Sequence, residues 1–473
     1  MHVKIMITIG PSCLDYNILK EMVKNGVRIF RLNFSHNTPE GFTPVISMVR
    51  KIEEELKIPI TLMGDLSGPK IRIGEVENSP LTVSKGSKLY LGLPDRRDFY
   101  TDLPYIPLVL KEIIKDLEEG VKVVLSDGVP VFRVIETVKK GELYVIEAEN
   151  SGIIASHKGI NFPGKKLSIS AVTEKDRKNI HDGLKVGVDG FALSFVQDRR
   201  DIEEAKKEID KENTWVPVIA KIETASAVEN FEEILEVADG AMVARGDLGL
   251  EYPLPKLPII QKKILQSCIK AHKPSIVATQ MLLSMVNNSL PTRAETTDVA
   301  NAIIDGADCL MLSDETAIGK YPLEAVKILR EIAETTEKYM SEKIGEPLKP
   351  YDTKDPGPYL AYSACLMANH ARCCAIACHS TSGKTASQMS SCRPFKPIYG
   401  LTPDKRVIKA MNFYWGVVPV LSDDSIPNHL DRVEKFVEES SLFRKGDRII
   451  ITSGQPTPGQ KEKHTNQIKI YYK

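Results

Sequence analysis

The stretch VPVIAKIETASAVENFEEILEVADGAMVARGD at positions 216–247 has the pattern of two apolar strands joined by one amphipathic helix. The first strand closes on Lys221-Ile222-Glu223, and the second closes on Arg245-Gly246, just before Asp247. Side chains two residues apart on a strand share a face, so Lys221 and Glu223 point the same way. If the strands are parallel neighbours, about 4.8 Å apart, Glu223 and Asp247 can converge on one divalent cation. The alternative is a surface ion pair followed by an ordinary turn.

The same strand-then-helix unit recurs along the chain. Eight apolar runs predict strands, and amphipathic stretches separate most of them. The expected strands are 3–9, 27–34, 59–65, 190–195, 216–223, 240–246, 275–280 and 309–313. The expected helices are 18–24, 44–56, 174–185, 202–209, 226–237, 256–271, 292–304 and 322–339. Eight such units predict an α/β fold, a (β/α)8 TIM barrel with its chemistry at the carboxyl ends of the strands.

Two parts of the chain depart from this repeat. Between the third and fourth strands the sequence changes to short β runs with turns, which predicts an inserted β-barrel domain that acts as a lid. After the last helix, a segment rich in Pro, Gly and charge predicts a linker to a C-terminal α/β domain. The expected boundaries are 1–73 and 160–340 for the barrel, 74–159 for the lid, 341–358 for the linker and 359–473 for the C-terminal domain.

The composition is that of an ordinary soluble protein. The chain has 473 residues, 42% of them hydrophobic, and 63 basic residues balance 63 acidic ones. That balance favours neither a nucleic acid nor a membrane surface as a partner. No run approaches the ~18 apolar residues of a membrane span, and the first residues lack a signal-peptide pattern. We therefore expect a cytoplasmic protein.

Eight cysteines are scattered along the chain, as expected for reduced thiols. Cys373, Cys374, Cys378, His379 and Cys392 could also be read as a metal cluster. Their spacing lacks the paired C-x-x-C ligands of zinc sites, and three of these cysteines lie in an apolar run, where cysteine acts as a small hydrophobe. We therefore favour buried thiols.

The second strand alternates sharply, with Arg31, Asn33 and Ser35 on one face. An arginine directed into a barrel mouth favours an anion, and phosphate suits its planar fork. The alternative is a structural ion pair between Arg31 and Asp65 on the neighbouring strand. The oxygens of Asn33, Ser35 and Asp65 could also form a second cation site. Lys70 and Arg72 add positive charge where the chain leaves for the inserted domain.

In the C-terminal part, Ser382-Gly383-Lys384-Thr385 is similar to half of a phosphate loop. It is not a Walker A motif, because the first glycine of that motif would fall on Cys378. The segment follows a strand and opens a helix, so backbone N–H groups could hold a phosphate there. The alternative is an ordinary helix N-cap.

Together, the motifs resemble those of the pyruvate kinase family along nearly the whole chain. The matching stretches are Arg31-Leu-Asn-Phe-Ser-His36, Asp65 through Arg72, Lys158-Gly-Ile-Asn-Phe-Pro-Gly164, Lys221-Ile-Glu223, Ala244-Arg-Gly-Asp-Leu-Gly249, Ala278-Thr-Gln-Met281, Pro291-Thr-Arg-Ala-Glu295 and Met311-Leu-Ser-Asp-Glu-Thr316. Several independent motifs in the same order argue against a chance match. The resemblance implies a homotetramer that transfers the phosphoryl group of phosphoenolpyruvate to ADP, giving pyruvate and ATP in the last step of glycolysis.

The resemblance also implies a role for each candidate residue. For catalysis it implies Lys221, Arg31, Thr279 and Ser313. For substrate binding it implies Arg31, Lys221, Gly246, Asp247 and Thr279, and for Mg²⁺ or Mn²⁺ it implies Glu223 and Asp247. For nucleotide binding it implies Asn33, Ser35, His36, Arg72 and Lys158.

Lys70 departs from the family pattern. Many members have Glu there and require K⁺ at the site formed by the residues that match Asn33, Ser35, Asp65 and Leu66. An ammonium carries the same charge as K⁺, so we expect Lys70 to substitute for the ion and the activity not to require K⁺. The common pattern also has Thr and Lys where Leu66 and Ser67 stand, which is consistent with a remodelled cation site.

The C-terminal part also matches the family's effector loops. Ser380, Thr381, Ser382, Gly383, Lys384 and Thr385 match the effector-phosphate loop, and residues 454–460 match part of the closing loop. The closing loop lacks the Trp and Arg found where fructose 1,6-bisphosphate is bound, so we expect a different phosphorylated effector or none.

Two other functions stay open at this point. One is a Mg²⁺-dependent aldolase or lyase that acts on pyruvate enolates, although neither has a use for the inserted lid. The other is a catalytically inactive homologue kept as a binding protein.

Overall fold

The computed structural model describes residues 1–69, 71–126, 128–343, 345–351, 353–454 and 466–473. Its centre is a closed barrel of parallel strands in the order β1-β16-β15-β14-β13-β12-β3-β2. These strands are β1 (Lys4–Thr8), β2 (Val27–Asn33), β3 (Thr61–Leu66), β12 (Gly190–Leu193), β13 (Val218–Ile222), β14 (Gly240–Ala244), β15 (Ser275–Ala278) and β16 (Cys309–Leu312). The TIM barrel expected from the sequence is therefore confirmed.

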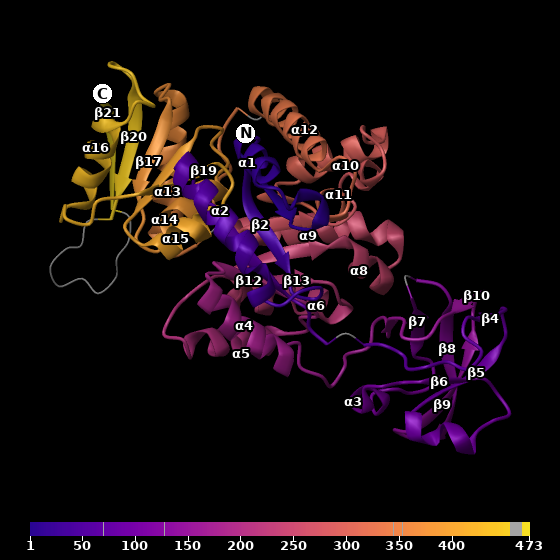
Figure 1. The fold of residues 1–473 in the computed structure, drawn as a ribbon. Coiled ribbons are helices and arrows are strands. Elements are labelled where there is room, and N and C mark those ends of the chain that lie inside the picture. Colours follow the sequence, from indigo (N-terminus) through magenta and orange to yellow (C-terminus); the bar gives the residue numbers. More distant parts are fainter. Residues whose placement is uncertain (70, 127, 344, 352, 455–465) are drawn as a thin grey trace.

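Helices cover the outside of the barrel (Figure 1). They are α1 (Tyr16–Lys24), α2 (Thr43–Leu56), α4 (Glu174–Val186), α5 (Arg199–Asp210), α6 (Ala225–Glu229), α7 (Phe231–Val237), α8 (Arg245–Glu251), α9 (Leu257–Lys270), α10 (Arg293–Ile304), α11 (Asp314–Ala317) and α12 (Pro322–Lys343). Outward strand residues such as Phe30 and Leu62 share one core with these helices. Inward residues such as Met63, Met242 and Met311 fill the barrel with a second core.

Several expected boundaries differ from the structure by a few residues, and two of the differences bear on the site. The single helix expected at 226–237 is split at Asn230, which ends α6 and begins α7. Asparagine favours helix caps over helix interiors, and the Asn230 amide donates to the carbonyl of Gln197 (3.0 Å). The strand expected at 240–246 ends at Ala244, so Gly246 and Asp247 lie in the first turn of α8.

The inserted domain is built from short strands. They are β4 (Leu81–Val83), β5 (Lys88–Gly92), β6 (Tyr105–Pro107), β7 (Lys122–Leu125), β8 (Val131–Lys139), β9 (Leu143–Ala148), β10 (Gly152–Ile154) and β11 (Ile160–Asn161), with α3 (Lys111–Ile114) between β6 and β7. They pair as a six-stranded sheet, β11-β7-β8-β9-β5-β6, and a separate pair, β10-β4. Residues 71–74 bridge the two edge strands of the six-stranded sheet. The Ile160 N–H of β11 donates to the carbonyl of Ile71 (3.2 Å), and the Gly74 N–H donates to the carbonyl of Pro107 in β6 (2.8 Å). The sheet is thereby closed into the expected β-barrel.

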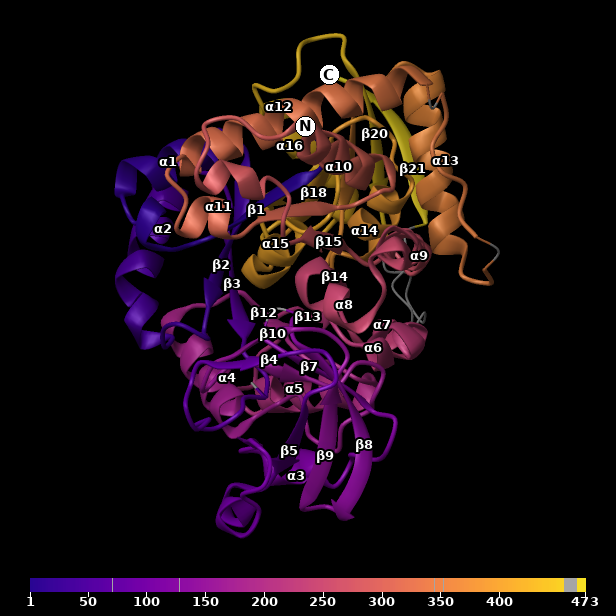
Figure 2. The same ribbon diagram turned by 90° about the vertical axis from the view of Figure 1, so that its right-hand side faces the viewer.

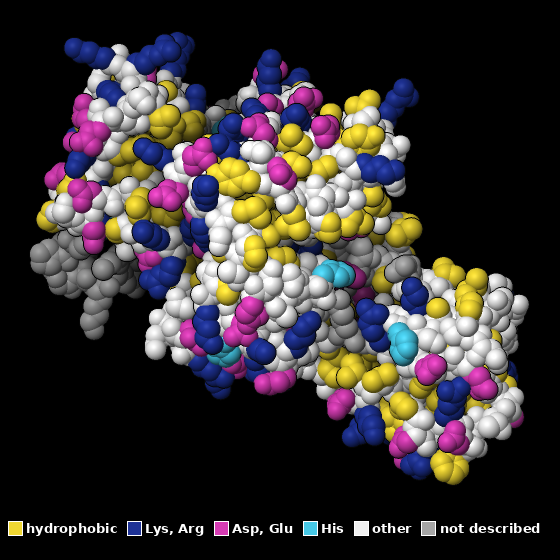
Figure 3. Space-filling model, in the orientation of Figure 1, with side chains coloured by type: hydrophobic (Ala, Val, Ile, Leu, Met, Phe, Trp, Pro, Cys, Tyr) yellow, Lys and Arg dark blue, Asp and Glu magenta, His cyan; other side chains and the backbone are white. Residues whose placement is uncertain are grey.

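The inserted domain stands away from the barrel in the structure (Figure 1). In the space-filling view a hollow separates it from the barrel mouth (Figure 3). The face toward this hollow is the one at which the chain leaves β3, so the domain is attached at the carboxyl ends of the barrel strands.

The C-terminal domain packs against the opposite end of the barrel (Figures 1 and 2). Its elements are α13 (Pro356–His370), β17 (Ala375–His379), α14 (Lys384–Ser391), β18 (Ile398–Thr402), α15 (Lys405–Met411), β19 (Val417–Leu421), α16 (His429–Glu439), β20 (Arg448–Ser453) and β21 (Gln467–Tyr472). The strands form one sheet in the order β19-β18-β17-β20-β21.

Residues after α15 close the amino end of the barrel. Phe413 is 1% exposed and belongs to the inner barrel core, and the Asn412 amide donates to the carbonyl of Pro59 just before β3 (3.0 Å). The Thr61 hydroxyl donates to the carbonyl of Lys409 (2.7 Å). Within the described ranges, no helix is long and apolar enough to cross a lipid bilayer.

Candidate active site

A cavity of 330 Å³ opens at the carboxyl ends of the barrel strands. Its walls come from the ends of β2, β13, β14, β15 and β16. They are Arg31, Asn33, Lys221, Glu223, Met242, Ala244, Gly246, Asp247, Ala278, Thr279, Gln280, Leu283, Met311, Ser313, Asp314 and Glu315. The structure therefore gathers in one place every residue expected to act in catalysis, substrate binding or divalent-ion binding.

Lys221 lies among polar groups from three neighbouring strands. Its Nζ is 2.8 Å from Oε1 of Glu223 and 3.3 Å from Oδ1 of Asp65. It also donates to the hydroxyl of Ser194 (2.6 Å), just after β12. The ammonium is held in one position at the barrel mouth by these contacts.

Burial and neighbouring charges have opposite effects on the pKa values of Lys221 and Asp65. Burial opposes the charge on Lys221, but the carboxylates of Asp65 and Glu223 outweigh it and raise the lysine pKa above its ordinary value. Burial likewise opposes ionisation of Asp65, yet the charges of Arg31 and Lys221 keep the Asp65 pKa below its usual range. Lys221 is therefore charged at neutral pH, and Asp65 is its ionised partner.

Glu223 and Asp247 have the donor chemistry of a divalent-cation site. Burial raises the pKa of Glu223 to about 7, against the pull of Lys221 and with the help of the Asp247 charge. A dication relieves both the burial of charge and the repulsion between carboxylates, and carboxylate oxygens are the ligands Mg²⁺ prefers. In the described part of the chain, no group of three His, Cys, Asp or Glu side chains is placed to hold a metal.

A strained bend sets the hydroxyl of Thr279 beside the backbone of Gly246. The Gly246 N–H donates to Thr279 Oγ1 (2.9 Å). Thr279 and Gln280 have φ angles of 68° and 54°, in the left-handed region that is costly for a β-branched residue. Arg245 holds the bend, because it donates to the carbonyl of Thr279 (2.7 Å) and pairs with Asp298 (2.6 Å).

Arg31 forms the ion pair that the sequence left as the alternative. Its Nε donates to Oδ2 of Asp65 (2.5 Å), and its Nη1 donates to the hydroxyl of Thr8 (3.0 Å). The guanidinium also lines the cavity. Its expected contact with an anion stays a prediction.

The hydroxyl of Ser313 is buried and has no hydrogen-bond partner among the described residues. The backbone around it is fixed, because Glu315 accepts the N–H of Ser313 (2.7 Å) and that of Leu282 (3.0 Å). A buried hydroxyl without a partner at a cavity wall is available to a water or a ligand.

The expected nucleotide-binding residues do not all meet at this cavity. Asn33 lines it and accepts the N–H of Ser35 (3.0 Å), while His36 is exposed on the loop that follows. Arg72 and Lys158 are exposed at the base of the inserted domain. There the backbone of Arg72 forms an antiparallel β-bridge with Gly159, the residue after Lys158. They lie outside the cavity walls because that domain stands away from the barrel.

The expected monovalent-cation site is only partly described. Asp65 is bonded to two cationic side chains, Arg31 and Lys221, and the Leu66 side chain is buried in the outer core of the barrel. Lys70 lies outside the described residues. Its role as a substitute cation stays a prediction.

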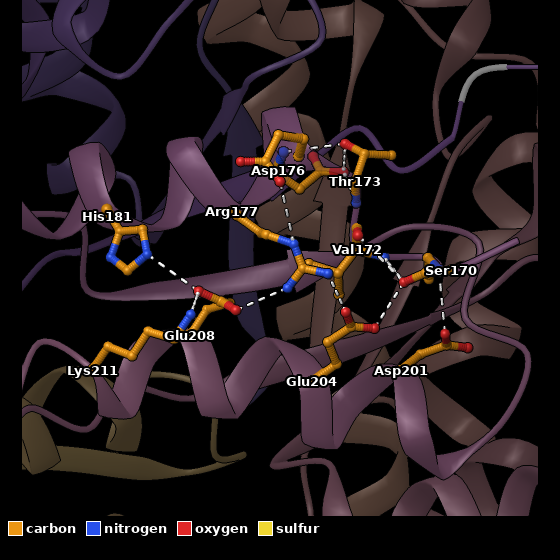
Figure 4. A network of polar contacts seen from close by, with 12 residues as sticks. Ser170, Val172, Thr173, Asp176, Arg177, His181, Asp201, Glu204, Glu208 and Lys211 are labelled. Atoms are coloured by element: carbon orange, nitrogen blue, oxygen red, sulfur yellow. Dashed lines mark hydrogen bonds and ion pairs between the residues drawn. The ribbon is translucent and has the colours of Figure 1, made fainter.

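A polar network joins α4 to α5 (Figure 4), and its member Asp176 also anchors the segment that follows β3. Asp176, buried in the first turn of α4, accepts the N–H of Ser67 (3.1 Å) and the hydroxyl of Thr173 (2.6 Å). One residue on, Arg177 pairs with Glu204 and with Glu208 (2.8 Å) of α5. Helix α4 is thereby tied both to the strand end that carries Asp65 and to the next helix.

The expected effector loop, residues 380–385, joins β17 to α14. Gly383 has a φ of 82°, and the Thr385 N–H donates to the hydroxyl of Ser380 (3.1 Å). Lys384 pairs with Asp355 (3.0 Å). Thr381 and Ser382 lie between these anchored positions. Residues 455–460 of the expected closing loop lie outside the described residues.

The alternative cysteine cluster is not formed in the described part of the chain. All eight cysteines are free thiols. Cys378 is fully buried, and burial raises its pKa to about 12. It is a packing residue, as the apolar run indicated.

Sequence reasoning missed Ser194 and Phe195. Ser194 accepts a hydrogen bond from Lys221, and the Phe195 N–H donates to Oε2 of Glu223 (3.0 Å). Both residues directly follow β12, where a barrel site is expected. Their position at a strand end was the available signal, but neither residue type by itself indicates chemistry.

Comparison with known proteins gives matches along the whole chain. The family model of the pyruvate kinase barrel domain matches residues 1–326, and that of the pyruvate kinase alpha/beta domain matches residues 359–471. The pyruvate kinase of Agrobacterium vitis is 40% identical over 470 residues, which cover 99% of this chain and 96% of that protein. The pyruvate kinases of Thermotoga maritima and Thermococcus litoralis are each 38% identical, over 99% of this chain and 98% of theirs.

The fold and these relatives define a phosphotransferase built on a TIM barrel. The chain belongs to the pyruvate kinase family. The resemblance inferred from the motifs is therefore confirmed.

Proposed function

We propose that this protein transfers the phosphoryl group of phosphoenolpyruvate to ADP and releases pyruvate and ATP. The observation that carries the proposal is the convergence of Lys221, Glu223, Asp247 and Thr279 on one cavity. The names of the relatives support the same reaction. The cytoplasm is the proposed location.

Glu223 and Asp247 are the proposed ligands of Mg²⁺ or Mn²⁺. An ion held there would supply positive charge that offsets the negative charge of the phosphoryl group. The Phe195 N–H contributes by fixing the orientation of the Glu223 carboxylate. Family membership supports a divalent ion, and the raised pKa of Glu223 supports these ligands.

Lys221 is the proposed electrostatic catalyst. Its ammonium stabilises the charge that develops on the transferred phosphoryl group and on the enolate oxygen. Preorganisation is the physical advantage, because Asp65, Glu223 and Ser194 fix the ammonium before substrate binds. Arg31 binds the phosphoryl group from the side of β2.

The proposed seat for the substrate carboxylate is formed by the backbone N–H groups of Gly246 and Asp247 and the hydroxyl of Thr279. Ser313 and Thr279 lie on the proposed proton path to the enolate carbon. The buried, unpartnered hydroxyl of Ser313 supports this role, because it needs no bond to be broken before it can contact a water or substrate.

Nucleotide phosphates are the proposed ligands of Asn33, Ser35, His36, Arg72 and Lys158. Arg72 and Lys158 reach them when the inserted domain moves over the barrel mouth. The two cations lie at the base of that domain, so a rotation there carries them toward the cavity.

Lys70 is the proposed substitute for K⁺, so that activity does not require the ion. The C-terminal domain is the proposed site of a phosphorylated effector at residues 380–385. The hydroxyls of Thr452 and Ser453, buried without partners among the described residues at the end of β20, support a ligand at this edge. A homotetramer is the proposed assembly.

Product analysis tests the reaction. Purified protein with phosphoenolpyruvate, ADP and Mg²⁺ should form ATP and pyruvate in equal amounts. Products of carbon–carbon bond chemistry would instead identify an aldolase or lyase, and the absence of turnover would favour an inactive homologue.

A further inference from the structure

One buried carboxylate joins the ends of β15 and β16. Glu315 is 1% exposed and lies in the wall of the barrel cavity. Its Oε1 accepts the N–H of Leu282 (3.0 Å), which follows the bend after β15. Its Oε2 accepts the N–H of Ser313 (2.7 Å), the first residue after β16. Hydrogen bonds from N–H groups to a carboxylate are stronger than those between neutral groups, so this side chain fixes the two segments relative to each other.

The two segments carry the hydroxyl groups of the proposed proton path. Strands β15 and β16 are parallel neighbours, with Ala278 opposite Met311, so Thr279 and Ser313 leave the sheet close to each other. The Ser313 hydroxyl is buried and has no hydrogen-bond partner among the described residues. Its position relative to Thr279 therefore depends on the backbone of both segments.

The short helix that carries Glu315, α11, lies against the end of β1 (Figure 2). Thr316 is fully buried, and its hydroxyl donates to the carbonyl of Thr8 (2.9 Å). A Cβ added at Gly10 would lie only 2.7 Å from the Cβ of Ala317, so the two backbones are in close contact. The backbone of Glu315 is thereby held by β1, and its carboxylate is a fixed point to which the other two segments attach.

Arg245 also holds the bend after β15, but by different atoms. It donates to the carbonyl groups of Thr279 (2.7 Å) and Gln280 (3.3 Å). Its hydrogen bonds among the described residues do not extend to Ser313. Arg245 therefore shapes the bend, whereas Glu315 sets the bend and Ser313 relative to each other.

We propose that Glu315 is a positioning residue for the proton-transfer step, because it places the Ser313 hydroxyl relative to Thr279 and the enolate carbon. This inference rests on the proposed function. In the step, the Ser313 hydroxyl gives its proton to C3 of the enolate and takes one from water. The π electrons of the C2–C3 bond form the new C–H bond, while a lone pair of the enolate oxygen completes the C2 carbonyl. Both oxygens of Glu315 accept N–H bonds, so it acts through Ser313 and not as a proton donor.

A positioning role predicts that proton transfer is more sensitive to a change at Glu315 than phosphoryl transfer is. The contacts that hold Lys221 and Glu223, the proposed phosphoryl-transfer groups, come from β3 and from the residues after β12. General acid–base catalysis contributes about 10²–10⁴-fold to a rate. Loss of alignment at Ser313 should therefore slow protonation of the enolate more than it slows the transfer.

The test compares two reactions of the full-length protein. One is ATP formation from phosphoenolpyruvate and ADP. The other is exchange of the methyl protons of pyruvate in D₂O with Mg²⁺ and inorganic phosphate, followed by NMR, which uses the proton path without phosphoryl transfer. Glu315→Gln keeps the size of the side chain, but its amide nitrogen cannot accept an N–H. Glu315→Asp keeps the charge but is one methylene too short to reach both N–H groups. In each variant, exchange should fall at least about tenfold more than ATP formation.

Glu295→Gln is the matched control. Glu295 also accepts backbone N–H groups just beyond the same bend, those of Ser284 and Thr292 (2.7 Å each), but it lies outside the cavity wall. The ratio of the two reactions should stay at its wild-type value in this variant. An equal loss of both reactions in the folded Glu315 variants, or a greater loss of ATP formation, overturns the positioning role.

A second measurement does not depend on turnover. Thermal unfolding shows that each variant is folded, and mass spectrometry then follows amide hydrogen exchange in segments 279–284 and 311–316. Both segments should exchange faster in Glu315→Gln than in wild type, and unchanged exchange overturns the joining of the two segments even if ATP is formed. If wild type forms no ATP, the proposed function fails and the proton-transfer role fails with it, whereas faster amide exchange in the variant would still show that Glu315 joins the segments.

Discussion

Nζ of Lys221 lies 2.8 Å from Oε1 of Glu223, two residues along the same face of β13. The pair places a fixed cation directly beside a carboxylate that is proposed to bind a metal ion. The hydroxyl of Ser194 holds the lysine from the neighbouring strand end (2.6 Å). The position of the Lys221 ammonium group, as well as its charge, is therefore fixed before a ligand binds.

Ser194→Ala should lower turnover by about tenfold, because a hydrogen bond to a charged group contributes about 1.5–3 kcal/mol. The half-saturating concentration of phosphoenolpyruvate should change less, since Lys221 remains in the cavity. Steady-state kinetics measure both. Ser47→Ala, on the exposed part of α2, is the control. Unchanged turnover in Ser194→Ala would show that this bond does not position the lysine.

Gly246→Ala should fold normally and bind substrate poorly. A Cβ at Gly246 would lie 3.6 Å from Oγ1 of Thr279, an ordinary contact, and would occupy the proposed carboxylate seat. One added methyl in a close-fitting site changes specificity by about 10–200-fold, so we expect a rise of that order in half-saturating phosphoenolpyruvate.

The matched control for this change is Gly345→Ala, where no atom lies within 4 Å of the added Cβ. Thermal unfolding should be unchanged in both variants. Normal saturation kinetics in Gly246→Ala would place the substrate carboxylate elsewhere.

Glu208→Gln should lower stability at neutral pH but not in acid (Figure 4). Burial opposes the charge of Glu208, but bonds from Lys211, Arg177 and His181 outweigh it and keep the Glu208 pKa below its ordinary value. A lowered pKa gives stability that is fully present above the unfolded pKa of about 4.3 and is lost as pH falls through the folded value.

The measurement is the difference in thermal midpoint between wild type and variant across pH 3–8. Glu203→Gln, at an exposed ion pair on the same helix, is the control. A difference that persists unchanged into acid would contradict the assignment of this stability to the Glu208 charge.

Lys70→Glu should create a requirement for K⁺. The substitution removes the proposed substitute cation and introduces the residue that the family resemblance associates with a K⁺ requirement. We expect little turnover of the variant in sodium or tetramethylammonium salts and recovery when K⁺ is added. If K⁺ changes the turnover of neither wild type nor Lys70→Glu, the activity is independent of K⁺ but Lys70 is not the reason.

The barrel could be predicted from sequence because each strand is a short apolar run that ends in polar residues, and each alternates with an amphipathic helix. Asn230 and Ala244 show the limit of that pattern. A cap inside an amphipathic stretch splits a helix without interrupting its periodicity, and a strand end that turns directly into α8 has no breaker residue.

The site was predictable where chemistry-bearing residues follow strands, as for Lys221, Glu223 and Asp247. Two of its features depend on three-dimensional placement. The pairing of Arg31 with Asp65 depends on strand register, and the separation of Arg72 and Lys158 from the cavity depends on the position of the inserted domain. Neither the strand register nor the position of the inserted domain can be predicted from a local sequence pattern.

The most direct test is phosphoenolpyruvate-dependent ATP formation from ADP with Mg²⁺ and without K⁺, measured for wild type, Lys221→Met and the exposed control Lys207→Met. We expect full turnover in wild type and control and a loss of about a thousandfold in Lys221→Met, with thermal unfolding confirming that the variant is folded. Full turnover in folded Lys221→Met, or none in wild type with or without K⁺, would contradict the proposed site.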